Sequence, residues 1–181
     1  MDIMNKFAYR YYNKREGPLL CLGKLCYSEA IKIRHKFITT ELEQKKYLEI
    51  RSTIEQIIYR SFLSKGGKPK NKYAYYFTID LKSIIKNYFT DPEYLYMPLS
   101  SFDRENISFT YGDSFLAYSR KDNHPTRRKV YTVDEIGQIA DQFGTDFDEN
   151  NHMEFIEMQL WDEKPLRKYC IENGLPPYGK K

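Results

Sequence analysis

Phe155-Ile156-Glu157-Met158-Gln159-Leu160-Trp161 has apolar side chains at positions 156, 158 and 160 and polar side chains between them. Neighbouring side chains of a β-strand point to opposite faces of a sheet, so this period of two predicts a half-buried strand. Aromatic and β-branched residues are concentrated in four further segments that we expect to be strands, at 7–12, 73–79, 94–99 and 107–111. Pro98 cannot donate to a strand ladder, which predicts a position at a sheet edge or a strand end.

Helix signals lie between these strands. Thr40 and Glu43 have the spacing of a capping box, and Gly66-Gly67 marks the end of the helix that follows. Apolar residues recur on one face of this helix, at Tyr47, Ile50, Ile54, Ile57, Ile58 and Phe62. Three further N-cap residues predict helices after them, namely Ser28, Asp80 and Thr132.

Helices and strands are interleaved without a regular βαβ rhythm, which predicts an α+β fold. We expect a single domain over residues 1–172, with a mixed or largely antiparallel sheet covered by about four helices, and a frayed tail at 173–181. No apolar run is long enough to span a bilayer, and the N-terminus lacks the features of a secretory signal. We therefore expect a cytoplasmic protein with no membrane partner.

Charge is divided unevenly along the chain. The net charge of +4 separates into +10 over residues 1–129 and −6 over residues 130–181. Residues 134–163 contain ten acidic side chains and no lysine or arginine. Either the two halves pair on folding, or the protein presents two faces of opposite sign. In the second case the acidic face 134–163 predicts a protein-interaction or inhibitor protein that mimics a nucleic acid.

Two basic clusters motivate the leading functional hypothesis. A Gly-Lys loop carries the first cluster, Lys65, Lys68, Lys70 and Lys72, and leads into a tyrosine-rich segment. The second cluster lies at 120–129 and contains Arg120, Lys121, Arg127, Arg128 and Lys129. Lysines neutralise phosphates and aromatic rings stack on bases. The pattern therefore predicts a binding or accessory protein that contacts an anionic partner, a nucleic acid or a phosphate-bearing ligand.

An enzyme is the competing hypothesis, either a hydrolase or a transferase, which would use the turn Tyr111-Gly112-Asp113-Ser114 together with Glu157 or His152. This segment follows an expected strand, and residues 107–115 resemble the strand and turn of the GDSL hydrolases. The resemblance implies that Ser114 is a nucleophile and that His152 acts as its base.

A second resemblance concerns a transferase. Arg10 or Arg15 near the first strand, the turn at Tyr111, and Glu157 on a late strand are similar in layout to the ADP-ribosyltransferases. The resemblance implies that Glu157 stabilises a cationic transition state. The sequence leaves open whether the protein is an enzyme.

A calcium site is a further possibility, and it would lie in the acidic segment. Residues 146–157 resemble an EF-hand loop, which implies Ca²⁺ ligands at Asp146, Asp148, Asn150 and Glu157. The alternative is a solvated acidic loop that enters the strand at 155–161. No strong motif requires another cofactor.

Overall fold

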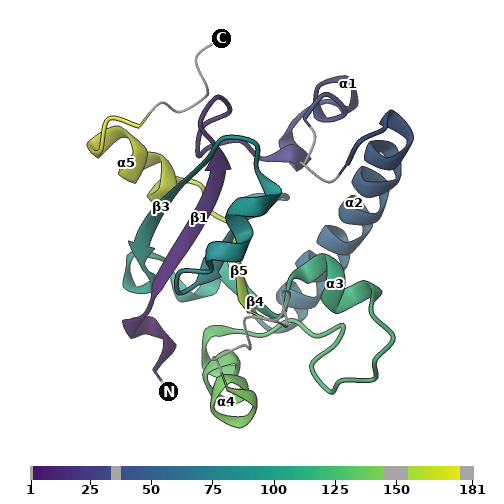
Figure 1. The fold of residues 1–181 in the computed structure, drawn as a ribbon. Coiled ribbons are helices and arrows are strands. Elements are labelled where there is room, and N and C mark those ends of the chain that lie inside the picture. The colour runs from purple at the N-terminus through teal and green to yellow at the C-terminus, as the bar shows by residue number, and fades with distance from the viewer. Residues whose placement is uncertain (1, 34–37, 145–154, 176–181) are drawn as a thin grey trace.

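The computed structural model describes residues 2–33, 38–144 and 155–175, and shows one sheet with helices on both faces (Figure 1). The five strands are β1 (Phe7–Asn13), β2 (Tyr75–Ile79), β3 (Pro92–Pro98), β4 (Ile107–Tyr111) and β5 (Ile156–Leu160). Every pair is antiparallel, in the order β3-β1-β2-β5-β4. The predicted α+β class is confirmed, and Pro98 ends the edge strand β3 as expected.

The α-helices are α1 (Tyr27–Ala30), α2 (Glu41–Ser64), α3 (Ser114–Ser119), α4 (Val133–Phe143) and α5 (Lys164–Glu172). The 3-10 helices are η1 (Ile3–Asn5), η2 (Leu22–Lys24), η3 (Ser83–Tyr88), η4 (Leu99–Ser101) and η5 (Arg104–Asn106). Within the described residues, no helix combines the length and apolar character needed to cross a membrane.

Local capping chemistry explains where the two best-predicted helices begin. Thr40 forms a capping box with Glu43 before α2, and Thr132 forms one with Glu135 before α4. The helix expected directly after Asp80 is wrong in type and start, because η3 is a short 3-10 helix that begins three residues later. Asp80 has a left-handed φ of 60° and pairs with Lys6.

One face of the sheet carries the main hydrophobic core. Phe109, Met158 and Leu160 point to this side and are fully buried against α4, α5 and the N-terminal segment. A second core lies between α2 and the opposite face, and is formed by Ile54, Ile58, Phe62, Ala74, Val130 and Trp161. The sheet is therefore covered on both sides, as the positions of α2 and α5 in Figure 1 show.

The face beneath α2 carries a row of polar side chains. The strand register aligns Tyr9 with Thr78, Thr78 with Glu157, and Glu157 with Thr110. The prediction that 155–161 is a half-buried strand is wrong in one respect, because every residue of β5 is buried. Glu157 is only 6% exposed and Gln159 is not exposed. Alternating polarity here marks an enclosed polar layer rather than a face open to water.

The long helix α2 is rotated relative to the expected apolar face. Ile50 and Ile57 are more than 40% exposed, whereas Gln44 and Glu55 are buried. Glu55 accepts hydrogen bonds from the Ala74 backbone N–H and the Tyr76 hydroxyl. Polar residues of α2 thus face the polar layer of the sheet, which an apolar periodicity cannot reveal.

Candidate functional site

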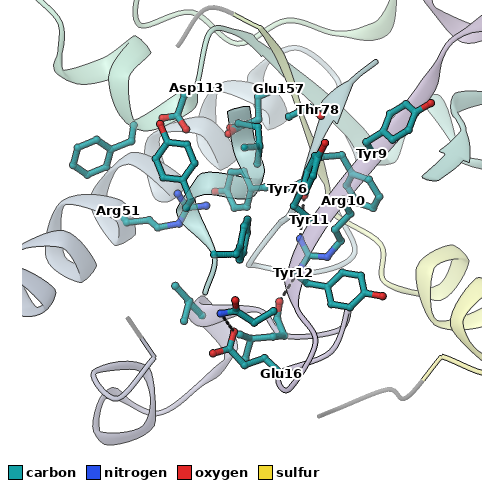
Figure 2. A pocket seen from close by; sticks show the side chains of 18 of the residues that line it. Tyr9, Arg10, Tyr11, Tyr12, Glu16, Arg51, Tyr76, Thr78, Asp113 and Glu157 are labelled. Carbon is teal, nitrogen blue, oxygen red and sulfur yellow. Dashed lines mark hydrogen bonds between the residues drawn. The ribbon is translucent and has the colours of Figure 1, made fainter. Parts of the chain in front are cut away.

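A cavity of about 400 Å³ lies between α2 and the polar layer of the sheet. Its walls are mainly apolar, and its tyrosines are Tyr9, Tyr11, Tyr12, Tyr47, Tyr76 and Tyr88. Figure 2 shows Asp113, Glu157 and Arg51 at one end of this tyrosine pocket and Glu16 at the other. A cavity of this size, mostly apolar and with few polar groups, is typical of a small-molecule site.

Glu157 is held in the pocket by a chain of hydrogen bonds. Its Oε1 atom accepts from the Gln159 Nε2 atom at 3.1 Å and from the Ser114 backbone N–H at 3.3 Å. Gln159 in turn accepts from Ser108 at 2.9 Å and donates to Thr110 at 3.1 Å. Because both ends of the Gln159 amide are bonded, its orientation and that of Glu157 are fixed.

The same chain extends away from the pocket. Trp161 donates from its indole N–H to Ser108 at 2.9 Å. Trp161 and Ser108 are both completely buried. A buried, satisfied network of this kind restricts its members to one arrangement, so the carboxyl group of Glu157 has a defined position in the pocket.

Asp113 lies at the N-terminus of α3, next in the chain to the residue that contacts Glu157. Gly112, with φ 98°, makes the turn out of β4, and the Asp113 Oδ1 atom accepts from the Leu116 backbone N–H at 3.2 Å. A helix N-terminus favours a carboxylate, because its free N–H groups point toward that charge. Local cap chemistry therefore positions the second carboxyl group.

The two carboxyl groups influence each other's ionisation. Burial, together with the nearby charge of Asp113, raises the pKa of Glu157 to about 8. Burial also raises the pKa of Asp113, but Arg51 and the backbone N–H groups of Leu116 and Phe115 oppose this by favouring its charged form. The pair is consequently expected to hold one proton at neutral pH, with that proton on Glu157.

Arg51 reaches this end of the pocket from α2. Its guanidinium group lies 4.0 Å from the centre of the Tyr76 ring and 6.0 Å from that of Tyr47. Burial would lower the pKa of Arg51, but the surrounding tyrosines and carboxyl groups outweigh it and raise the pKa. Arg51 therefore stays charged at any ordinary pH.

Arg51 and Gln159 were not nominated from the sequence. Tyr47, Arg51 and Glu55 follow one another at intervals of four residues, which places them on one face of a helix. This polar stripe beside the apolar face of α2 is the sequence feature that could have indicated a role for Arg51. The signal for Gln159 was its position two residues after Glu157, on the same face of the strand.

The structure brings some of the predicted catalytic residues together. Ser114 and Asp113 lie beside Glu157, but Ser114 makes its contact to Glu157 through the backbone N–H, and its side chain is buried. Tyr111 lies on the other side of the sheet, where its hydroxyl donates to the carbonyls of Phe143 and Gly144. His152 lies outside the described residues.

Arg10 is part of the pocket wall but has a different set of contacts. Its guanidinium group donates to the backbone carbonyls of Pro18, Leu20 and Tyr76 at 2.6–3.0 Å. All three bonds hold one chain segment to another. The combination of Arg10, Tyr111 and Glu157 suggested by the ADP-ribosyltransferase layout is therefore not assembled around one point.

Most of the predicted calcium ligands cannot be placed. Asp146, Asp148 and Asn150 lie outside the described residues, whereas Glu157 lies on β5 and faces Asp113 and Gln159. An EF-hand continues as a helix at this point, and the chain here is a strand. In the described ranges 2–33, 38–144 and 155–175, no group of three or more His, Cys, Asp or Glu side chains could hold a metal ion.

The two oppositely charged halves of the chain contact each other. Lys65 pairs with Glu135, and Lys70 pairs with Asp162 at 2.9 Å. Further ion pairs join the halves at Lys24–Glu163 and Arg104–Asp134. Of the first basic cluster, Lys68 also pairs within its own half, with Glu105 at 2.7 Å. Four ion pairs therefore join the two charged halves, and most of the side chains in them remain partly exposed.

The second basic cluster lies in the segment after α3. Arg127 forms a bidentate pair with Asp122, while Arg128 and Lys129 are exposed.

Comparisons with known proteins gave no match to a family, to a curated protein or to a solved structure.

Proposed function

We propose that the chain is an enzyme in which Asp113 and Glu157 act as a general acid–base pair on a small molecule bound in the tyrosine pocket. The supporting observation is that two carboxyl groups from distant parts of the chain, buried Glu157 and half-buried Asp113, line the same end of a 400 Å³ cavity. Enclosing carboxyl groups is unfavourable for folding, so their presence at a cavity suggests chemical use.

The protonation state of the pair suggests the role of each residue. Glu157 carries the shared proton at neutral pH because its pKa is raised to about 8, and it can donate that proton to a leaving group. Asp113 can accept a proton from water or from a substrate hydroxyl. Carboxyl pairs with this division of labour cleave or transfer glycosidic bonds, and the proposed reaction class is therefore a hydrolase or a glycosyl transferase.

Substitutions at the two carboxyl groups test this proposal. Turnover of nitrophenyl glycosides and of purine and pyrimidine nucleosides would be measured for wild type, Glu157→Gln and Asp113→Asn. Each variant should lower the rate by at least about 100-fold, because one partner in proton transfer is lost. Glu105→Gln is the matched control, since Glu105 is exposed and lies outside the pocket.

The pH dependence gives an independent readout. The wild-type rate should fall as the pH rises through about 8, where Glu157 loses its proton. The proposal would be contradicted if no compound in the panel is turned over. It would also be contradicted if Glu157→Gln retains the wild-type rate.

Binding of an anionic partner through the basic clusters stays a separate proposal. Lys72, Arg128 and Lys129 are exposed, and none has a carboxylate within 4.0 Å among the described residues. Filter binding of single-stranded and duplex nucleic acid at two salt concentrations tests it. Substituting these three residues with alanine should weaken binding and reduce its salt dependence.

A further inference from the structure

Arg51 makes no direct ion pair in the described chain, although it lines the same pocket as Asp113 and Glu157. Arg51 has no carboxylate within 4.0 Å among the residues that the structure describes. It lies beside the Tyr47 hydroxyl and is stacked on the Tyr76 ring, and both of these partners are uncharged. A partly buried arginine without a direct ion pair is unusual, because charged groups inside proteins are normally paired.

The guanidinium group of Arg51 is held in an orientation that suits the binding of an anion. Stacking on Tyr76 orients the flat guanidinium group, and its donors can form two parallel hydrogen bonds to an oxyanion. Because the side chain lines the cavity, the oxyanion would come from a bound molecule.

The rest of the pocket indicates what the oxyanion is attached to. Tyr9 and Tyr11 on β1 form one wall, and Tyr88 of η3 lines the same cavity. Tyr9 stacks on Tyr96 with ring centres 5.6 Å apart, and Tyr11 lies 5.6 Å from Tyr94. Rings that are supported from behind in this way give a firm flat surface for another ring.

We infer that Arg51 binds the anionic group of the substrate, and that the substrate is a small molecule with a planar ring joined to a phosphate or carboxylate group. This inference rests on the proposed function, because it assigns the substrate of the same pocket. The ring lies on the tyrosine wall, the anion is bound by Arg51, and the bond that reacts lies near Asp113 and Glu157.

Ligand pairs in which one member carries an anionic group and the other does not test the inference. Calorimetric titrations would compare adenosine monophosphate with adenosine and 4-hydroxybenzoate with 4-hydroxybenzamide. The charged member of at least one pair should bind about 10- to 100-fold more tightly, as expected for charge-assisted hydrogen bonds. The two pairs distinguish a phosphate from a carboxylate, and inorganic phosphate alone should bind more weakly than either ring compound.

Variants of Arg51 then show whether this residue causes the preference for the anionic ligand. Arg51→Met should abolish the preference for the charged member, and Arg51→Lys should reduce it, because lysine keeps the charge but not the planar donor pair. Arg60→Met is the control, since Arg60 is an exposed arginine on the same helix. If Arg51→Met does not fold, the Arg51→Lys result and the wild-type comparison decide the question.

The outcome can be separated from that of the proposed function. Titrations on Glu157→Gln should show the same preference, because that variant keeps Arg51 and the tyrosine wall. Equal affinity for charged and uncharged members would overturn the inference, as would a preference that survives Arg51→Met. Anion binding by Glu157→Gln without loss of turnover would instead overturn the acid–base proposal alone.

Discussion

Replacing Glu157 by glutamine tests whether the pocket keeps this carboxyl group protonated. The pKa of Glu157 rises from an ordinary 4.5 to about 8, because the group is buried and lies beside Asp113. The unfolded chain ionises near the ordinary value, so the folded protein binds one proton more between these two pH values. The contribution of Glu157 to folding stability is therefore fully present below the ordinary pKa and is lost as the pH rises through about 8.

The size of the effect follows from the two pKa values. A tenfold change in a protonation equilibrium corresponds to about 1.4 kcal/mol, so wild type should lose about 4 kcal/mol from this group between about pH 5 and about pH 9. Glutamine has nearly the shape of the neutral acid and does not titrate. The free energy of unfolding of Glu157→Gln relative to wild type should therefore increase by the same amount over this range.

Urea unfolding at several pH values would measure this difference. Asp113→Asn is an informative second variant, because asparagine keeps the helix cap but removes the charge that repels ionised Glu157. The loss of stability with rising pH should then be smaller than in wild type. Glu105→Gln, at an exposed position, should follow wild type at every pH. A difference between wild type and Glu157→Gln that stays constant with pH would refute the reasoning.

Three further substitutions test hydrogen bonding and packing elsewhere in the fold and in the polar layer. Gln159→Leu should lower the free energy of unfolding by about 3 kcal/mol in urea, because Ser108 and other buried groups lose their partner. Gly67→Ala should lower it by about 1–3 kcal/mol, measured by thermal unfolding. The added Cβ atom would lie 2.6 Å from the buried ring of Phe62. Tyr111→Phe should reduce stability by about 1 kcal/mol and leave ligand binding in the pocket unchanged.

Elements defined by neighbouring residues could be predicted from the sequence. The capping box of Thr40 and Glu43 and that of Thr132 and Glu135 both occur where expected, because all their contacts lie within one turn. The strand at 107–111 has the predicted bounds. Helices α3 and α5 were not expected, since both are short and depend on packing against the rest of the fold.

The residues of the site were predicted only in part, for a physical reason. The sequence nominated Asp113, as part of the 111–114 turn, together with Glu157 or His152, but not as a pair of carboxyl groups that share a proton. The antiparallel pairing of β4 with β5 brings the two carboxyl groups together. Sequence alternation shows which side chains share a face, but it does not show what covers that face. Arg51 contacts the site only because α2 crosses it, so its role depends on tertiary packing.

The polar layer beneath α2 differs from a purely structural network in one respect. The buried polar side chains of Ser108, Gln159 and Trp161 all have hydrogen-bond partners, as a structural network should. The network ends, however, at the carboxyl group of Glu157, whose pKa is raised, and this group borders the same cavity as Arg51, which has no ion pair in the described chain. A layer selected for stability alone would end in apolar side chains that close this space. The satisfied part of the network is therefore best understood as the support, and the incomplete part as the site that it positions.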